Sequence, residues 1–376
     1  LVTAPTPVPA GANPYTPTNG QTVECSPAGT PATAGVISAT TTGEGNGVTV
    51  TVAAGTAYTV VGSTIGLGSN ATVNNSGALN TSSFYNGYGI SAGANGRSQA
   101  GGNSLNNLSG GTIVTGGNNA VGIYISATNA SSAANTITNA GSITTSGGSA
   151  AGIRLNSGSK TGVNSIVNSG TISTSGGSSN GIDILGTAQV TVENTGSITA
   201  TGSNSFGIYS SGNITTLNNS QGGSSPLTYS GVLPLNYNVI VTNPTTYGKL
   251  DASGGNVSGV MNFGIKSGST LAFNTTYSTV LSGIKVNNLG SSYGSFTAGG
   301  NTYQWALAHR INGSSDQTDL VILPAPVAPT LPAIESALQA ESYLIAPIYY
   351  DTQTALTSLG NTLQSIFAMQ TSGVVN

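Results

Sequence analysis

The sequence repeats itself between residues 70 and 220, and this repetition restricts the possible folds more than any other feature. A pattern of the form Asn-x-Gly-x-(Ile/Leu) recurs, and a Gly-Ile pair follows each copy. The isoleucines of successive pairs lie 33, 30, 29 and 26 residues apart, so the spacing drifts while the order of the parts is constant. Such periods are typical of solenoids, propellers and arrays of small units. The pattern begins at Asn75, Asn139, Asn168 and Asn194, a stretched copy ends at Ile113, and the paired isoleucines are Ile90, Ile123, Ile153, Ile182 and Ile208.

Each unit shows the two-residue period of a strand with one buried face. Apolar and small polar residues alternate, as in Ile123-Tyr124-Ile125. Gly-Gly and Asn-x-Gly clusters between these segments supply turns with positive φ. Strands this short bury a continuous apolar column only when they are stacked. We therefore predict an all-β fold, a right-handed parallel β-helix (solenoid) over about 40–300, with a β cap and a short C-terminal α-helix. The residues expected to face inward are Ile143, Ile153, Ile172, Ile182, Ile198 and Ile208.

Other repeat architectures fit the sequence less well. A β-propeller would repeat at about 40 residues or more with aromatic signatures, and neither is present. Calcium-binding Gly-Gly-x-Gly-x-Asp repeats are absent, and 55 glycines argue against a helical solenoid.

The composition excludes further classes. Only 5% of the residues are charged, whereas an average soluble domain is about a quarter charged. No apolar run of about 18 residues predicts a membrane helix, and the regular spacing of Ile, Val and Leu argues against disorder. A net charge of −3 with scattered cations gives no footprint for nucleic acid. A surface of Ser, Thr and Asn suits an extracellular all-β protein, and we expect Asn and Thr ladders to replace surface ion pairs.

The single cysteine and the N-terminus also bear on location. One cysteine, Cys25, forms no internal disulfide. The scarcity of cysteine fits a chain that crosses a periplasm unfolded, and it equally fits a simple lack of need. We expect Cys25 to be a core residue of the first rung, with an intermolecular crosslink as the alternative. Because the chain starts at Leu1 without a basic and apolar leader, we expect a signal peptide to have been removed.

Changes in composition divide the chain into five segments. In order they are a Pro-rich N-terminal arm, the β-helix repeats, a C-terminal cap, a Pro-rich linker and a helical tail. In the tail, residues 350–371 place Leu356, Leu359, Leu363 and Ile366 at helical spacing, which predicts an amphipathic helix with one buried face. The segments are 1–24, 25–226, 227–323, 324–349 and 350–376.

Three of these segments together resemble the passenger domain of autotransporters (type V secretion). The first is the run of Asn-x-Gly-(Ser/Thr)-Ile and Gly-Ile repeats. The second is the cap, with Tyr237-Asn-Val-Ile-Val241 and Tyr303-Gln-Trp305-Ala-Leu307. The third is the tail, which is similar to the helix that threads the barrel pore in that family.

The resemblance implies a location and a route. In that family the β-helix is secreted ahead of an outer-membrane barrel, and the cap closes it next to the membrane and aids folding. The barrel is absent here, because the sequence stops at Asn376. Some members are cleaved beside an asparagine inside the pore, which implies release with part of the pore helix attached. The expected location is extracellular or on the bacterial cell surface, reached through the outer membrane.

No pair of acids predicts catalysis. Glycoside hydrolysis needs two carboxyl groups roughly 5–10 Å apart on one face. Asp183 and Glu193 are ten residues apart in one unit, without a third acid. Asp316 and Asp319 fall in what we interpret as a polar turn of the cap. We interpret all four as surface acids and turn formers.

Nucleophilic and metal sites are also disfavoured. His309 is the only histidine, and a Ser-His-Asp triad would depend on it. No Gly-x-Ser-x-Gly elbow has a convincing strand-turn-helix context. One histidine, one cysteine and scattered acids do not predict a metal site. Gly116-Gly117 is interpreted as a turn, without the lysine of a phosphate loop. We therefore predict no enzyme and no catalytic, cofactor-binding or metal-binding residues.

Without a site, function is expected to reside in the surface and the ends of the rod. The leading hypothesis is a structural subunit of an extracellular fibre or coat, assembled by end-to-end contacts between copies of the chain. The alternative is a monomeric adhesin that binds host or neighbouring cells through its Ser/Thr/Asn face, and a remote alternative is a β-helical polysaccharide-acting enzyme. The expected partners are other copies, a cell-surface or matrix ligand, and the chain's own outer-membrane barrel during secretion, with no nucleic acid.

Overall fold

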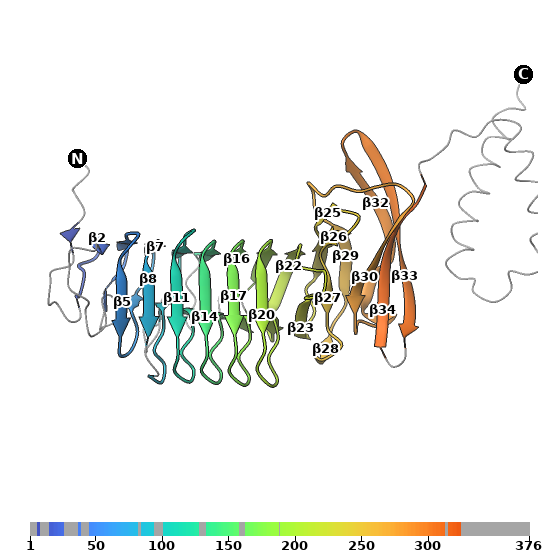
Figure 1. The fold of residues 1–376 in the computed structure, drawn as a ribbon. Coiled ribbons are helices and arrows are strands. Elements are labelled where there is room, and N and C mark those ends of the chain that lie inside the picture. Colours follow the sequence, from blue (N-terminus) through green and yellow to red (C-terminus); the bar gives the residue numbers. More distant parts are fainter. Residues whose placement is uncertain are drawn as a thin grey trace, which may run out of the picture. The chain divides into compact units, whose positions relative to one another are not determined.

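In the computed structural model the chain winds into a coil of three long β-sheets (Figure 1). Residues 325–376 are a second unit, which lies outside the described residues. This range contains the predicted pore-like helix and all of the predicted linker except residue 324. The described residues are 6–7, 15–25, 37–38, 45–81, 84–93, 101–127, 133–157, 162–187, 189–312 and 315–324.

Sheet 1 is a 12-stranded sheet in which all neighbouring strands are parallel. Its strands, in spatial order, are β1 (Thr6–Pro7), β2 (Thr22–Cys25), β4 (Thr49–Val52), β7 (Thr72–Asn75), β10 (Ser104–Asn107), β13 (Thr136–Asn139), β16 (Val163–Asn168), β19 (Gln189–Asn194), β22 (Asn213–Asn219), β24 (Asn236–Val239), β29 (Met261–Ile265) and β31 (Leu289–Ser291).

Sheet 2 is a 6-stranded parallel sheet whose strands follow sheet 1 in the turns from β4 to β20. Its strands are β5 (Ala57–Val60), β8 (Ala78–Thr81), β11 (Thr112–Thr115), β14 (Ser142–Thr145), β17 (Thr171–Thr174) and β20 (Ser197–Ala200).

Sheet 3 is a 14-stranded sheet that begins parallel and ends antiparallel. Its parallel strands are β3 (Ile37–Ser38), β6 (Ile65–Leu67), β9 (Ile90–Ala92), β12 (Ile123–Ala127), β15 (Ile153–Ser157), β18 (Ile182–Gly186), β21 (Ile208–Ser210), β23 (Leu227–Val232), β27 (Leu250–Asp251), β28 (Val257–Ser258) and β30 (Thr275–Ser282). The antiparallel end is formed by β34 (Ser315–Ile322), β33 (Asn301–Asn312) and β32 (Tyr293–Ala298). A small hairpin of β25 (Val241–Asn243) and β26 (Thr246–Tyr247) and a 3₁₀ turn η1 (Val286–Asn288) complete the described elements.

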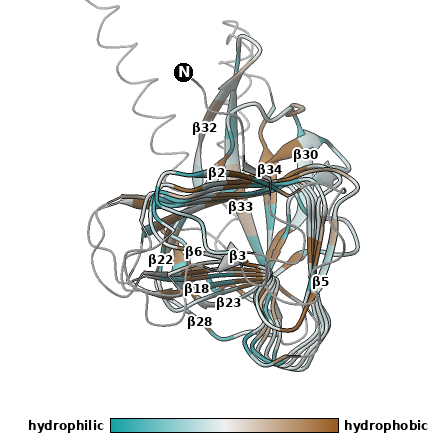
Figure 2. Ribbon diagram, turned by 90° about the vertical axis from the view of Figure 1, so that its left-hand side faces the viewer, coloured by the Kyte–Doolittle hydropathy of each residue, from teal (hydrophilic) through white to brown (hydrophobic). Residues whose placement is uncertain are grey.

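The predicted β-helix is confirmed, including its inward isoleucines. Equivalent residues of successive repeats are direct neighbours, for example Ile143 and Ile172 in sheet 2. Seen along the coil in Figure 2, the sheets enclose the interior. The exposed fractions are 0% for Ile143, Ile153, Ile182 and Ile208, 1% for Ile172 and 2% for Ile198.

The drift in repeat spacing arises mainly in one connection. The chain returns from sheet 3 to sheet 1 through residues 93–103 in an early turn, 128–135 in the next, and only 211–212 in a late turn. Most strands of the repeats keep their register, with one shift between β19 and β22, because each strand must place its apolar side chains on the same column.

The repeat asparagines form a ladder inside the coil. In each step the side-chain amide nitrogen donates to the amide oxygen of the next asparagine, at 2.8 Å from Asn139 to Asn168 and 3.0 Å from Asn194 to Asn219. These side chains are 0% exposed, so the expectation of surface ladders is wrong for this set. A buried amide must find partners, and stacked identical asparagines satisfy one another. The members are Asn75, Asn107, Asn139, Asn168, Asn194 and Asn219.

The repeat glycines are required by the close stacking of turns. A Cβ atom on Gly170 would lie 2.1 Å from the carbonyl oxygen of Gly141 in the turn below. The same distance would separate a Cβ on Gly196 from the Gly170 oxygen. No other residue type fits where the backbone of one turn rests directly on the next.

The cap closes the C-terminal end of the interior. Sheet 2 ends at β20, but sheets 1 and 3 continue to β31 and β30 through residues that the sequence assigned to the cap. The antiparallel strands then fold over the end, where Trp305 is 6% exposed and packs edge-on against Phe263, with ring centroids 5.5 Å apart.

Candidate functional site

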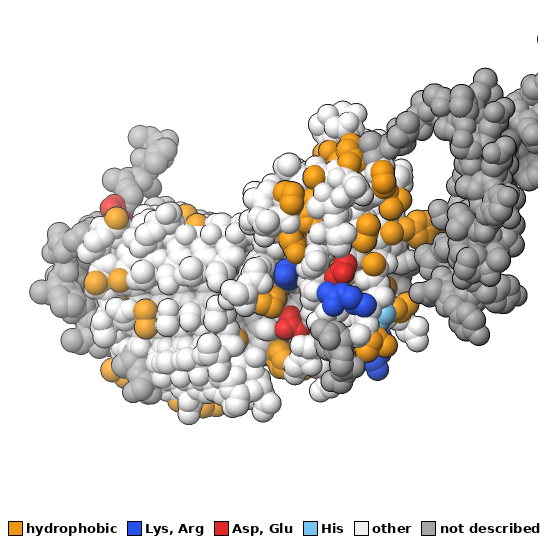
Figure 3. Space-filling model, turned by 45° about the vertical axis from the view of Figure 1, so that its right-hand side comes forward, with side chains coloured by type: hydrophobic (Ala, Val, Ile, Leu, Met, Phe, Trp, Pro, Cys, Tyr) orange, Lys and Arg blue, Asp and Glu red, His pale blue; other side chains and the backbone are white. Residues whose placement is uncertain are grey.

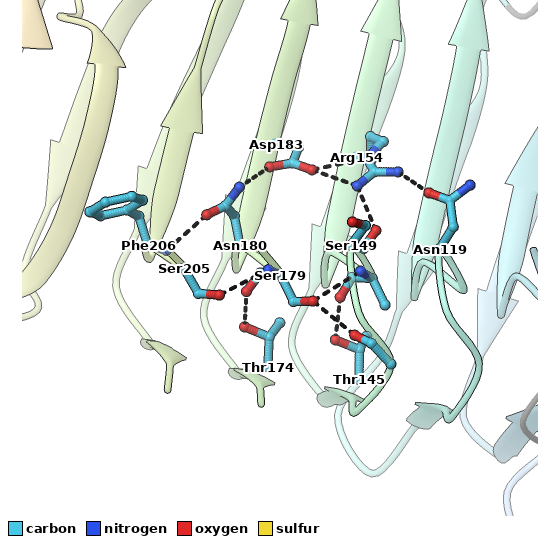
Figure 4. A network of polar contacts seen from close by, with 12 residues as sticks. Asn119, Thr145, Ser149, Arg154, Thr174, Ser179, Asn180, Asp183, Ser205 and Phe206 are labelled. Carbon is cyan, nitrogen blue, oxygen red and sulfur yellow. Dashed lines mark hydrogen bonds and ion pairs between the residues drawn. The ribbon is translucent and has the colours of Figure 1, made fainter. Parts of the chain in front are cut away.

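The main charged cluster on the repeats is an ion pair between neighbouring turns of sheet 3 (Figure 4). Arg154 of β15 lies beside Asp183 of β18, with its Nη2 atom 2.8 Å from Oδ2. Asn180 donates to the other carboxylate oxygen at 2.6 Å and accepts from the Phe206 amide at 2.8 Å. On the opposite side, Arg154 Nη1 donates to Asn119 Oδ1 at 2.6 Å. The polar chain thus links several turns along the coil.

This network stabilises the fold rather than offering a binding site. The Arg154 and Asp183 side chains are 15% and 5% exposed, and each polar group already has a partner. The interpretation of Asp183 as a surface acid is therefore wrong. The sequence could have predicted that Arg154 and Asp183 lie side by side, because each directly follows the isoleucine of a Gly-Ile pair.

The turns between sheets 2 and 3 form a second ladder beside this network. The buried hydroxyls of Thr145 and Thr174 donate to the carbonyl oxygens of Ala150 and Ser179 within their own turns. Ser205 Oγ accepts from the Ser179 amide of the preceding turn at 2.9 Å. These corners are rigid because side chains replace the hydrogen bonds that irregular backbone lacks.

The carboxylates considered for catalysis do not form a pair. Asp183 lies on sheet 3, whereas Glu193 lies on sheet 1, where it forms an ion pair with Lys266 at 3.1 Å. Asp316 and Asp319 lie within strand β34, so their assignment to a turn is wrong. Each faces a basic partner on β33 across the antiparallel ladder.

The two ring nitrogens of His309 contact a hydroxyl and a carboxylate, but these groups do not form a catalytic triad. Its Nε2 is 3.1 Å from Asp316 Oδ1, and its Nδ1 is 3.2 Å from Thr318 Oγ1. Thr318 is 0% exposed, so a substrate carbonyl cannot reach that hydroxyl. Thr318 is the direct cross-strand partner of His309 in the cap sheet, and Asp316 lies two residues away from Thr318 on the same strand.

A polar cluster that the sequence did not indicate holds a bulge in the cap. Thr279 has φ 54, which is rare for a β-branched residue. Its amide donates to Asp319 Oδ1 at 2.6 Å, and Arg310 binds both oxygens of Asp319 at 3.1 Å. Arg310 also donates to Thr279 Oγ1 at 2.8 Å. The cluster supports the register shift between β30 and β34.

Cys25 is a core residue, as expected from the sequence. It is 0% exposed. Burial raises the pKa of its thiol to about 11, with a smaller opposing contribution from the hydrogen bond with Tyr58. A buried, protonated thiol is a poor crosslinking group.

Other kinds of site are weakly represented in the described part of the chain. Among those residues, no three His, Cys, Asp or Glu side chains gather as a metal site would need. No described helix is long and apolar enough to cross a bilayer. A recess of about 310 Å³ in the cap is lined by residues 268–271, Ala298, Gly299, Asn301 and Tyr303. Tyr303 is the one ionisable side chain among these lining residues.

The exposed surface differs between the coil and the cap. On the face drawn in Figure 3, the coil is mostly white, the colour of uncharged polar side chains and backbone, with a few hydrophobic patches, while hydrophobic and charged side chains are denser over the cap. On the outer face of sheet 2, Thr171, Ser173, Ser197 and Thr199 are exposed. They form two pairs, Thr171 beside Ser197 and Ser173 beside Thr199, and the members of each pair lie one turn apart.

Comparisons with known proteins give no match to a protein-family model, to a curated protein or to a solved structure.

Proposed function

We propose that this protein is a secreted, non-catalytic structural subunit of an extracellular fibre or surface coat, in which copies join through the ends of their β-helices. The resemblance to autotransporter passengers supports delivery through the outer membrane to the cell surface. The scarcity of charge supports close association of copies, because little electrostatic repulsion opposes it.

The observation that carries this proposal is strand β1. The N-terminal arm adds this strand to the end of sheet 1, where Thr6 and Pro7 pair in parallel with Val23 and Glu24 of β2. The arm therefore carries a segment that can complete this sheet end. A neighbour's arm would make the same backbone hydrogen bonds, as in strand addition between proteins. Because the arm and this sheet end are both N-terminal, the contact joins two copies end to end at their N-termini, and a second junction elsewhere on each copy extends such pairs into a fibre.

Deletion of residues 1–14 tests the proposal, because it removes β1 and leaves β2 with its buried Val23 in place. Negative-stain microscopy of the full chain is expected to show long fibres, and the deletion variant is expected to give short single particles. A variant in which residues 1–14 are replaced by an equally long Gly/Ser sequence controls for length. Fibres of parental length from the deletion variant would rule out the arm as connector. A full chain that stays monomeric at high concentration would overturn the fibre itself.

The exposed face of sheet 2 favours a second candidate function, a monomeric adhesin. The hydroxyls of Thr171, Ser173, Ser197 and Thr199 face solvent in a regular array without charge. Such an array suits an uncharged, hydroxyl-rich ligand on another cell. Thr171→Lys combined with Ser197→Lys is expected to abolish cell binding if the adhesin function holds, and to leave fibre formation unchanged if it does not.

A further inference from the structure

Strand β32 forms an open sheet edge in the described part of the molecule. It ends sheet 3 and pairs only with β33 among the described residues. It is six residues long and contains neither a charged residue nor a proline. In Figures 1 and 2 it projects away from the coil. An edge with these properties invites pairing with another strand.

The pairing pattern shows which backbone groups of β32 are available. The Leu307 amide donates to the carbonyl of Ser292, so these two residues are a hydrogen-bonded pair. Because such pairs alternate with non-hydrogen-bonded pairs in an antiparallel ladder, every second residue of β32 is hydrogen-bonded to β33. The intervening residues are Tyr293, Ser295 and Thr297, whose N–H and C=O groups point to the free side. No described residue forms a backbone hydrogen bond with them there. All three side chains are exposed.

Three other sheet ends of the described chain are blunted. At the C-terminal end of sheet 2, the side-chain amide of Gln221 pairs with both backbone groups of Ile198, at 2.8 and 2.9 Å. At the N-terminal end of sheet 1, β1 is two residues long and includes Pro7, which has no N–H. At the other end of sheet 1, β31 is three residues long and its register is shifted. The open edge of β32 contrasts with these devices.

We propose that β32 binds the β32 strand of a second copy, antiparallel and centred on Ser295. The three free residues are symmetric about Ser295, so a two-fold axis there places Tyr293 opposite Thr297 of the second copy, and the reverse. Each hydrogen-bonded pair exchanges two bonds, which gives about six bonds across the axis. The two aromatic–β-branched pairs add side-chain contact. The contact deepens the proposed function, because it supplies a tail-to-tail junction alongside the junction made by the arm.

Single cysteines test this register directly. In an antiparallel hydrogen-bonded pair the Cα atoms are about 5.5 Å apart, within the range of about 4.4–6.8 Å that a disulfide requires. Ser295→Cys in the full chain is therefore expected to give a disulfide-linked dimer with oxidised glutathione. Thr297→Cys is the matched control, because its two copies would be about 14 Å apart along the strands. Buried Cys25 is present in both variants. Equal crosslinking of the two variants, or none in either, would overturn the proposed pairing.

Sedimentation of the full chain gives a second measurement. Ser295→Pro removes an outward N–H at the centre of the contact and is expected to weaken dimerisation at least tenfold. Ser295→Ala removes only the hydroxyl and is expected to dimerise like the parent. Circular dichroism confirms that both variants are folded. Dimerisation of Ser295→Pro with parental affinity would refute the contact.

Different experimental outcomes would contradict the proposed fibre and the proposed β32 contact. Long fibres without crosslinking at position 295 would leave the fibre standing and remove the β32 contact. Crosslinked dimers without fibres would retain the contact and remove the fibre. Absence of dimers together with absence of crosslinking would overturn the β32 contact.

Discussion

Ile172 and Thr171 are neighbours in β17, yet one is 1% exposed and the other faces solvent. The alternation follows from the strand geometry, which sends successive side chains to opposite faces. Such residues from all three sheets fill the coil interior in stacked columns, so a defect at one position affects the turns on both sides of it.

Ile172→Asp is expected to destabilise the coil by roughly 3–5 kcal/mol, because an unpaired carboxylate would enter the apolar column. Thr171→Asp, one residue away, is expected to cost less than about 0.5 kcal/mol as a surface change. Chemical denaturation followed by circular dichroism compares the two. Similar midpoints for both variants would contradict the assignment of the inward face.

Cys25 makes the folded protein sensitive to alkaline pH. The pKa of its thiol rises from an ordinary 9.0 to about 11 in the folded chain. The folded state therefore holds the proton more tightly, and this stabilisation is complete below pH 9 and is lost as the pH rises towards 11. The loss amounts to about 3 kcal/mol. Cys25→Val lacks this contribution, so the denaturation midpoint of the parent is expected to fall relative to that of the variant between pH 8 and 11. A constant difference across that range would contradict the prediction.

At the scale of elements, the end of sheet 2 depends on one side chain. Gln221 supplies both a donor and an acceptor to Ile198 of β20, in place of the next strand. Its side chain also accepts from the Asn194 amide at 3.1 Å, and its backbone carbonyl accepts at 3.0 Å from Asn219, the last member of the asparagine ladder. One glutamine thus terminates sheet 2 and contacts the end of the ladder.

Gln221→Met keeps the length of the side chain but removes both hydrogen bonds to Ile198. It is expected to cost roughly 2–3 kcal/mol, because two buried backbone groups lose their partners. Hydrogen exchange at the Ile198 amide is expected to accelerate by at least tenfold, while exchange at Ile143, in the middle of the same sheet, is unchanged. Uniform acceleration in both strands would indicate global destabilisation instead.

At the scale of the whole molecule, only 5% of the residues are charged, and the proposed contacts are backbone hydrogen bonds at sheet ends. Fibre length is therefore expected to change little between about 50 mM and 500 mM salt, since screening acts on charges. Microscopy of fibres assembled across that range measures the effect. A steep shortening with salt would show that charged residues of the cap, such as Arg310, take part in assembly.

The sequence alone determined the solenoid and its inward isoleucines, because the two-residue period and the order of the parts are local properties of the chain. It did not place the repeat asparagines in the interior, since a polar residue type indicates the surface until stacking supplies an identical partner above and below it. The stacking of turns also decided the burial of Asp183, which depends on Arg154 one turn away. The end of sheet 2 at Gln221 and the open edge of β32 are likewise consequences of tertiary structure. Whether a strand has a neighbour depends on where the rest of the chain lies, and no local pattern encodes it.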